Sequence, residues 1–302
     1  MEEMTTGLCP KCGHTLQIPA ELERFSCMYC GDRLTKRQLL TQPEEASCSE
    51  EDCAVSFDHA VSRLGWCVQN FRGYQKKILR DAFFEAFETY ETGCAPVIQE
   101  LNSGVRPERQ TELLDRAAEA MLDELSAGWE KKNDMEDEKV VLAIFFVPMV
   151  RKLQLPVSEE FVSLLQKKWV ERYPKSPFYL GDYESISGGF RKKFLGLCFI
   201  TTAVCQELGK PDDCAELTAF RAFRDGYLAA QPDGEALIRE YYNIAPGIVT
   251  CINTCSDRHA SYERIREQYL TPCYEDLLAG RNADCKTRYV QMVRDLEREY
   301  LN

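Results

Sequence analysis

The chain has 302 residues, of which 44% are hydrophobic and 28% are charged, and this composition is typical of folded globular proteins. Its formal net charge of −12 argues against nucleic-acid binding, which usually requires a basic surface. The longest apolar run, residues 140–150, is about half as long as the ~20-residue helix that crosses a bilayer, so no membrane partner is expected.

The N-terminus and the cysteine content indicate a cytoplasmic protein. Residues 1–9 contain neither the basic segment nor the apolar segment of a secretory signal peptide. The chain has 15 cysteines, an odd number, which is atypical of a secreted disulfide framework. We therefore expect a reducing compartment in which the thiols are either metal-bound or free.

Residues 1–40 contain two C-x2-C pairs, separated by fourteen residues and each followed by glycine. The pairs are Cys9 with Cys12 and Cys27 with Cys30. Zn²⁺ takes four thiolates in a tetrahedron, and a glycine after each pair permits the positive φ of a tight turn. The pattern predicts a small β-rich zinc ribbon with one structural Zn²⁺. The alternative, two redox pairs, is not favoured because the surroundings do not indicate a thioredoxin-like βαβ unit.

The chemistry around the ribbon favours a protein partner over nucleic acid. Residues 1–42 hold five basic and five acidic side chains, so the ribbon carries no net charge. Ribbons that bind nucleic acid tend to be basic or aromatic on one face. His14 follows the second cysteine closely, but four thiolates already complete the ligand set, so His14 is not expected to bind the metal.

Residues 41–70 are expected to form an acidic linker, with or without a short helix, because residues 43–58 contain six acids and no base. Several cysteines and one histidine in and after this segment could form a second metal site. They are Cys48, Cys53, His59, Cys67 and Cys94. Their spacing is irregular, so ordinary free cysteines are the favoured interpretation.

Residues 71–188 are expected to form a helical middle domain, since apolar residues recur at three- and four-residue intervals. The predicted helices span 71–91, 107–128, 136–153 and 158–173. The third is apolar around most of its circumference, which is typical of a central buried helix. Pro148 is expected to kink or end it.

Residues 189–302 are expected to form a helical array, with helix starts predicted at Asp212, Asp233, Ser256 and Asn282. Almost no alternating pattern occurs beyond residue 35. The predicted fold is therefore mainly α: a small β-rich zinc ribbon followed by a multi-helix array in one or two helical domains. If there are two, the boundary is expected at the glycine pair 188–189.

Three cysteines lie within residues 198–214 and admit several roles. On a helix, Cys198 and Cys205 share one face, while Cys214 falls in the first turn of the next helix, where the helix dipole would lower the pKa of a thiol. They could be buried hydrophobes, ligands of a second metal, or reactive or redox thiols, with buried cysteine favoured. A Cys–His nucleophile would need His259, and no pattern places that residue beside Cys198.

The segment FRAFRD, residues 220–225, suggests an anion pocket. Arg221 and Arg224 could bind a carboxylate or a phosphate. The favoured alternative is a surface ion pair between Arg221 and Asp225 beside a core phenylalanine.

Residues 198–248 resemble the CFI-box domain, a bacterial C-terminal module. The matching residues are Cys198-Phe199-Ile200, Phe223-Arg224-Asp225, Tyr241-Tyr242 and Pro246. The order of ribbon, helical middle and CFI-box end is also similar to that of zinc-ribbon proteins of gut Firmicutes, so the resemblance covers most of the chain. It implies no particular reaction. Many CFI boxes carry Ala-Tyr-Gly where this chain has Val204-Cys205-Gln206, which argues against an essential Cys198–Cys205 pair.

These features favour a non-enzymatic interaction or regulatory protein with a protein partner. The clear chemical site is structural, and no phosphate-binding loop, carboxylate pair or metal-hydrolase motif is visible in the sequence. One alternative is a thiol-dependent enzyme or redox sensor centred on Cys198. Another is a zinc ribbon that binds nucleic acid.

Overall fold

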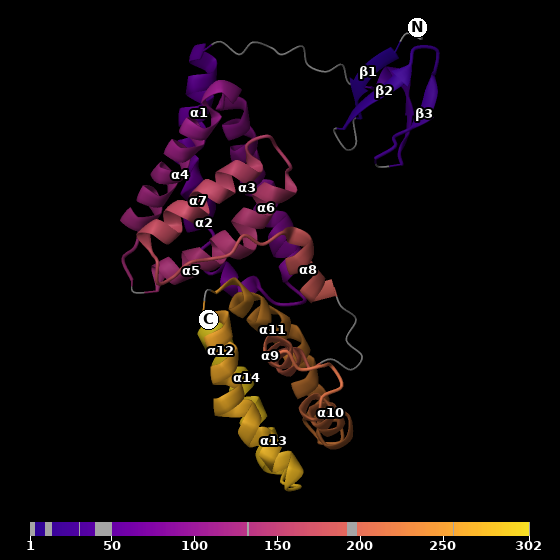
Figure 1. The fold of residues 1–302 in the computed structure, drawn as a ribbon, viewed down its shortest axis with the longest axis vertical. Helices are drawn as coiled ribbons and strands as arrows, with labels where there is room; N and C mark the ends of the chain where they lie inside the picture. Colours follow the sequence, from indigo (N-terminus) through magenta and orange to yellow (C-terminus); the bar gives the residue numbers. More distant parts are fainter. Residues whose placement is uncertain are drawn as a thin grey trace. The chain divides into compact units, whose positions relative to one another are not determined.

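The computed structural model describes residues 4–9, 14–29, 31–39, 50–131, 133–191, 198–255 and 257–301. It divides into two compact units, Met1–Ala54 and Val55–Asn302. The chain is mainly helical, and small antiparallel sheets occupy its N-terminal end (Figure 1). The predicted fold class is confirmed to this extent.

The N-terminal unit contains two short β-hairpins. Their strands are β1 (Met4–Leu8), β2 (Thr15–Pro19), β3 (Arg24–Ser26) and β4 (Arg33–Thr35), followed by a 3₁₀ turn, η1 (Lys36–Gln38). β1 pairs with β2 and β3 pairs with β4, both antiparallel. Alternation along β2 and β4 buries Leu16, Ile18 and Leu34 while their neighbours stay in contact with solvent.

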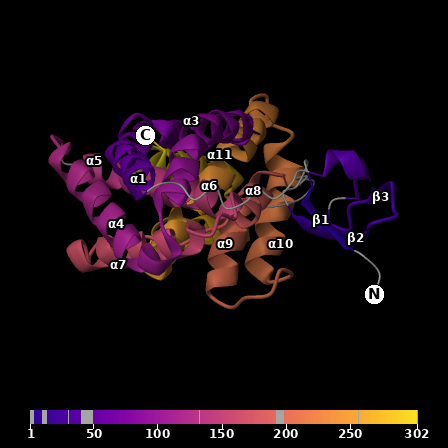
Figure 2. The ribbon, with the colours of Figure 1, turned by 90° about the horizontal axis from the view of Figure 1, so that it is seen from above.

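A set of helices that enclose an aromatic core follows, and the first of them crosses the boundary between the two units at Val55. They are α1 (Glu50–Leu64), α2 (Trp66–Gln69), α3 (Phe83–Gly104), α4 (Gln110–Ala127), α5 (Asp134–Val141), α6 (Val147–Lys152), α7 (Ser158–Arg172) and α8 (Tyr183–Arg191), with 3₁₀ turns η2 (Tyr74–Lys77) and η3 (Pro107–Arg109). The helices α4 and α7 pack side by side (Figure 2). The helix predicted over 158–173 matches α7 closely.

The remaining helices form the C-terminal array. They are α9 (Phe199–Glu207), α10 (Ala215–Ala222), α11 (Gly234–Thr254), α12 (Arg258–Ile265), α13 (Thr271–Leu278) and α14 (Asn282–Tyr300). α11 packs against α9 and α14. The starts predicted at Asp233 and Asn282 agree with α11 and α14, whereas α10 begins three residues after Asp212. Ser256 lies outside the described residues.

Much of the segment 41–70, which was expected to be an acidic linker, is helical and packed into the core. Residues 40–49 lie outside the described residues, but the chain is helical from Glu50 onward. Phe57 and Leu64 of α1 are buried in the core of the second unit. The acidic residues at the start of α1 lie in its first turn, where negative charge complements the helix dipole.

The helix predicted over 71–91 is wrong in its first half. Gly73 has a φ of 90°, a left-handed conformation that an α-helix cannot contain. The chain continues through η2 and turns again before α3 begins at Phe83. The apolar spacing of residues 71–82 therefore reflects packing of turns against the core.

Three π-helical segments interrupt the long helices within the described residues: η4 (Leu142–Phe146), η5 (Phe223–Leu228) and η6 (Arg266–Leu270). Pro148 follows η4, and Pro272 follows η6. A proline ring clashes with the carbonyl four residues earlier, and a wider π turn relieves that clash. The central helix consequently continues past Pro148 rather than ending there.

The parts of the second unit before and after residue 188 are joined by hydrogen bonds from backbone N–H groups. The Arg80 N–H donates to the carbonyl oxygen of Asn243 at 3.0 Å, and the Asp81 N–H donates to its side-chain oxygen at 3.2 Å. Gly247 lies so close to Ile78 that a Cβ atom on Gly247 would overlap the Ile78 carbonyl oxygen. The segment 78–81 is therefore seated directly on α11.

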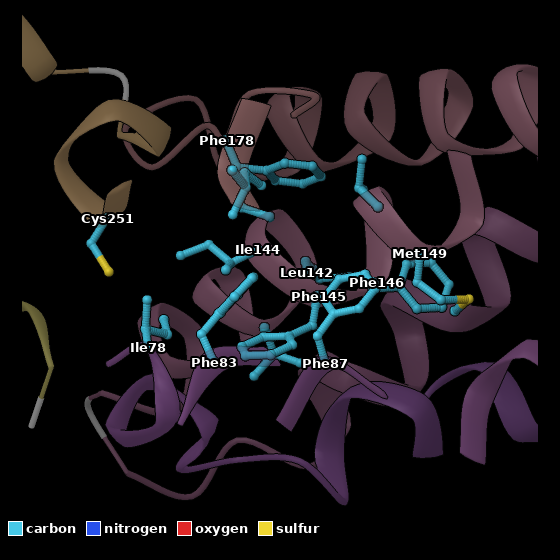
Figure 3. Close-up of a cluster of buried hydrophobic side chains, with 14 of the residues drawn as sticks. Ile78, Phe83, Phe87, Leu142, Ile144, Phe145, Phe146, Met149, Phe178 and Cys251 are labelled. Atoms are coloured by element: carbon cyan, nitrogen blue, oxygen red, sulfur yellow. The ribbon is translucent and has the colours of Figure 1, made fainter. Parts of the chain in front are cut away.

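One continuous hydrophobic core runs through the second unit. Its buried side chains extend from Phe57 to Leu301 and come from both of the expected helical domains, 71–188 and 189–302. The rings of Phe83 and Phe190 stack with centroids 4.3 Å apart. Figure 3 shows phenylalanines of α3 and η4 facing one another, with Ile78 and Cys251 at one side of the cluster.

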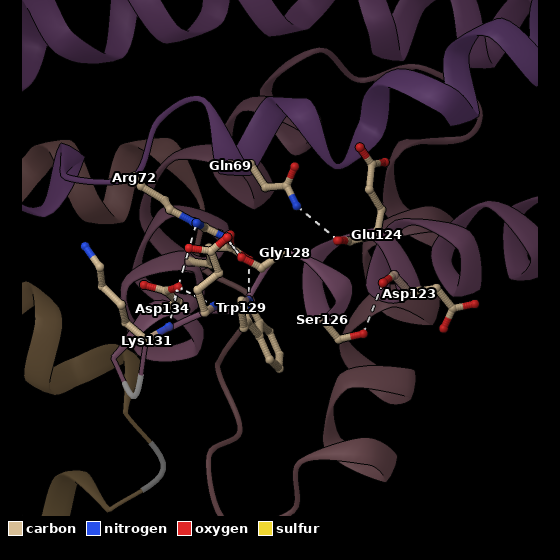
Figure 4. A network of polar contacts seen from close by, with 11 residues as sticks. Gln69, Arg72, Asp123, Glu124, Ser126, Gly128, Trp129, Lys131 and Asp134 are labelled. Carbon is tan, nitrogen blue, oxygen red and sulfur yellow. Dashed lines mark hydrogen bonds and ion pairs between the residues drawn. The ribbon is translucent and has the colours of Figure 1, made fainter.

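A network of polar contacts that includes Arg72, Gly128 and Trp129 holds the turn between α4 and α5 (Figure 4). Glu138 is fully buried and accepts hydrogen bonds from Arg72 Nε at 2.6 Å and Trp129 Nε1 at 2.7 Å. Arg72 also donates to the carbonyl oxygen of Gly128 at 3.0 Å. Burial raises the pKa of Glu138, while its bonds to Trp129 and Arg72 oppose that rise. The network satisfies a polar group that would otherwise be costly to bury.

Candidate functional site

The two N-terminal hairpins carry equivalent backbone hydrogen bonds just after their first strands. Cys9 follows β1, and its N–H donates to the carbonyl oxygen of His14 at 2.9 Å. Cys27 follows β3, and its N–H donates to the carbonyl oxygen of Asp32 at 2.8 Å. Each bond joins a cysteine to the residue five positions later, and we call the segments 9–14 and 27–32 the hairpin tips. Residues 10–13 and 30 lie outside the described residues. Gly31 has a φ of 73°, as expected for a glycine in a tight turn.

The two tips meet in the small core of the N-terminal unit. Cys9 and Cys27 are 1% and 2% exposed and belong to one cluster with Leu16 and Leu34. The ring of His14, from the first tip, stacks on Tyr29 of the second with centroids 4.3 Å apart. Cys12 and Cys30 lie outside the described residues. Cys9 and Cys27, which are buried in one cluster, are of the ligand type that a structural Zn²⁺ site uses.

The residues that resemble a CFI box gather around Cys198. Cys198 precedes α9, and its sulfur lies 3.6 Å from Nη1 of Arg224 in η5. Arg224 is largely buried and makes two hydrogen bonds to Asp225, at 2.7 and 2.8 Å. The Ile200 N–H donates to the Tyr241 hydroxyl oxygen at 3.0 Å. The motif residues thus serve mutual contacts that fix the start of α9.

A small cavity of about 60 Å³ lies beside Cys198 and is lined mainly by apolar side chains. Arg224 is among its lining residues, whereas Arg221 is not. Arg221 instead bonds to Asp212, through the carbonyl oxygen at 2.8 Å and the carboxylate at 2.7 Å. Both arginines of the suggested anion pocket therefore already have aspartate partners, Asp212 and Asp225.

Cys198 lacks the surroundings of an activated thiol. Burial raises the pKa of Cys198, and the charges of Arg224 and Arg221 oppose this rise without cancelling it. His259 lies on α12, where its ring contacts Glu207 and Glu263. A nucleophilic role for Cys198 would need a thiolate that this environment disfavours.

We expect Cys198 to alkylate slowly in the native protein at pH 7, and its rate to rise about tenfold per pH unit through pH 9, because only the thiolate reacts. Iodoacetamide labelling followed by peptide mass spectrometry measures the rate at each cysteine, with the urea-unfolded chain as the reference. If Cys198 reacts faster in the native protein than in the unfolded chain, the thiol is activated and the enzyme hypothesis gains its first support.

The other two candidate thiols form a separate cluster without Cys198. The sulfurs of Cys205 and Cys214 are 3.8 Å apart. A carboxylate oxygen of Glu216 joins them, so that all three ligand atoms lie within 4.8 Å of one another. Within the described ranges, no other Cys, His, Asp or Glu side chains form a group of three at such distances. Burial and the neighbouring Cys214 raise the pKa of Cys205 to about 12.

Sequence reasoning missed Glu216, although it follows Cys214 by two residues. Carboxylates near a helix start are common, and nothing local marks this one as a neighbour of Cys205. Among the thiols between residues 48 and 94, Cys67 and Cys94 interact, which raises the pKa of Cys67. His59 instead bonds to Glu100 at 2.7 Å, and Cys48 lies outside the described residues.

None of the helices within the described residues is long and apolar enough to cross a membrane. Comparison of the chain with protein-family models, curated proteins and solved structures found no match.

Proposed function

We propose that the protein is a non-enzymatic interaction or regulatory protein whose N-terminal unit is a zinc ribbon. One structural Zn²⁺ would be held by Cys9, Cys12, Cys27 and Cys30. The observation that carries the proposal is the meeting of two equivalent hairpin tips, each starting at a buried cysteine. Two C-x2-C pairs at these tips supply the four thiolates that a closed structural zinc site needs.

The size of the N-terminal unit supports a structural role for the metal. Its hydrophobic cluster contains Leu16, Leu34 and the two cysteines, with Phe25 and Leu39 packed partly against it. In units shorter than about 70 residues a single hydrophobic core supplies little stability, and natural units of this size often add a metal or disulfides. Bound Zn²⁺ would therefore supply most of the folding free energy of the ribbon.

The ribbon also presents apolar side chains to solvent, which supports a protein partner. Met28 is 77% exposed and Tyr29 is 58% exposed, and they are adjacent in the Cys27 tip. Aromatic residues and methionine are enriched in protein interfaces. We place the partner-binding surface at this tip and propose a cytoplasmic location, where the free thiols of the helical unit remain reduced.

The helical unit, in the same proposal, is a CFI-box-like scaffold. Its motif residues around Cys198 are engaged with one another, and burial raises the pKa of the Cys198 thiol. These observations favour a packing role over thiol catalysis. The proposal therefore assigns no reaction to this unit.

The test is capture of a partner by the full zinc-loaded chain under chemical crosslinking. Met28→Asp should reduce the amount of captured partner at least about tenfold, because a charge at the centre of an apolar interface is costly. Leu278→Asp is the matched control, since Leu278 is 70% exposed on α13 of the other unit. The same partner must be captured by the control and lost with the tip variant.

Equal capture by both variants would remove the tip from the proposal. Retention of RNA or DNA that falls steeply as salt rises would instead support the nucleic-acid alternative.

A further inference from the structure

We propose that Cys205, Cys214 and Glu216 form a second metal site in the helical unit, for a soft divalent cation such as Zn²⁺ or Cd²⁺. The site would have two sulfur ligands and one oxygen ligand, with a fourth position open to solvent or to an external ligand. It lies in the second unit and does not depend on the metal of the N-terminal ribbon.

The backbone between α9 and α10 brings the two thiols together. Gly209 has a φ of 68° and ends α9, and the Lys210 N–H donates back to the carbonyl oxygen of Cys205 at 2.8 Å. The Cys214 N–H donates to the carbonyl oxygen of Pro211 at 3.1 Å, and Cys214 itself precedes α10. The thiols are therefore positioned by a closed, hydrogen-bonded turn.

The spacing of the ligand atoms suits a tetrahedral ion. Two sulfurs that each lie about 2.3 Å from a metal, at the tetrahedral angle, are roughly 3.8 Å apart. The Cys205 and Cys214 sulfurs are 3.8 Å apart in the structure. The Glu216 oxygen lies within 4.8 Å of both sulfurs, so a small side-chain rotation completes three ligands. Three protein ligands with one open position is an arrangement that Zn²⁺ adopts in proteins.

Access and charge also fit a site that exchanges its ion. Cys205 is buried, Cys214 is half-buried, and the Glu216 side chain is 32% exposed. In the structure, Lys210 Nζ donates to Glu216 Oε1 at 2.5 Å and supplies the positive charge that an ion would bring. The Lys210 side chain is equally exposed and can turn toward solvent when a cation binds. Because thiolates are the ligands, binding must release protons and strengthen as pH rises.

Two other thiol pairs show what distinguishes this cluster. Cys67 lies beside Cys94, and Cys273 lies beside Cys285, and all four side chains are fully buried. Within the described residues, neither pair has a third Cys, His, Asp or Glu ligand atom within 4.8 Å of both sulfurs. They are close-packed thiols in the core. Cys205 at the end of α9 and Cys214 at the start of α10 instead meet a carboxylate at the surface.

The experiment is titration of the full, reduced chain with Cd²⁺ in the absence of oxygen. The ultraviolet thiolate-to-cadmium charge-transfer band monitors binding, and elemental analysis gives the bound cadmium per chain. Cys205→Ser combined with Cys214→Ser should lower the bound Cd²⁺ by one equivalent per chain. Cys273→Ser combined with Cys285→Ser is the matched control and should lower it by none. The C9S/C27S variant should retain the one Cd²⁺ equivalent bound at the Cys205, Cys214 and Glu216 site. Failure of the ribbon proposal can therefore be told apart from failure of this one.

Two surface variants keep the test decisive if the serine variants fold poorly. Glu216→Gln should weaken Cd²⁺ binding at this site at least about tenfold. Lys210→Gln should strengthen it roughly threefold or more, because it removes a competing cation from Glu216. Unchanged affinity in both variants would overturn the proposal. Equal cadmium content in the reduced chain and in its Cys205→Ser, Cys214→Ser variant would also overturn it. A Cys205–Cys214 pair that forms a disulfide, and binds no ion when reduced, would do the same.

Discussion

Replacing Cys9 or Cys27 by serine is expected to unfold the N-terminal unit and to remove one metal equivalent from the chain. Structural zinc sites contribute an apparent binding free energy of about 10–16 kcal/mol at pH 7, and in small units this is folding free energy. The described apolar cluster of the unit is too small to compensate for that loss. Elemental analysis gives the metal content, and limited proteolysis reports the unfolding.

The helical unit should be unaffected, because its core from Phe57 to Leu301 contains no residue of the hairpins. His14→Ala is the control within the ribbon: it removes a stacked ring but no expected ligand, so the metal equivalent should remain. Serine variants that keep their metal, or a His14 variant that loses it, would contradict the four-cysteine assignment.

Gly247→Ala is expected to destabilise the helical unit by about 3 kcal/mol or more. A methyl group at this position would overlap the backbone carbonyl oxygen of Ile78, and a backbone atom cannot rotate away as a flexible side chain can. For a domain of this size, the melting temperature should fall by roughly 6–12 °C. Thermal unfolding followed by circular dichroism measures the change.

Gly226→Ala supplies the matched control for this substitution. Gly226 also lies in a helical segment of the same unit, yet a methyl group on its Cα would have no neighbouring atom within 4 Å, and its φ is not positive. The free energy of unfolding should change by less than about 1 kcal/mol. Similar melting temperatures for the two variants would mean that the contact between α11 and Ile78 is not tight.

Local patterns account for the parts of the fold that the sequence predicts well. The helix over 158–173 is defined by its own apolar spacing and by Pro174 after it, and α7 agrees with both. The turn after the second cysteine pair needs a positive φ, and Gly31 adopts one. Features of this kind depend on residues within one or two turns of the chain.

The parts that sequence reasoning missed depend on contacts between distant residues or on turn geometry. The apolar spacing around Gly73 resembles a helix, but a left-handed residue breaks it. Whether Cys205 meets Cys214 depends on the closed turn at Gly209, and Glu216 joins them only once α10 has formed. The CFI-like segment, residues 198–248, is visible as a pattern, but its mutual contacts required three-dimensional placement.

The seating of segment 78–81 on α11 has a consequence for folding during synthesis. Asp81 and its partner Asn243 are 162 positions apart in the chain. At 5–20 residues per second, the ribosome needs roughly 10–30 s to make the intervening chain. Throughout that interval the apolar surface around Ile78 and Phe83 has no α11 to cover it. The nascent chain therefore exposes this apolar surface until its last third emerges.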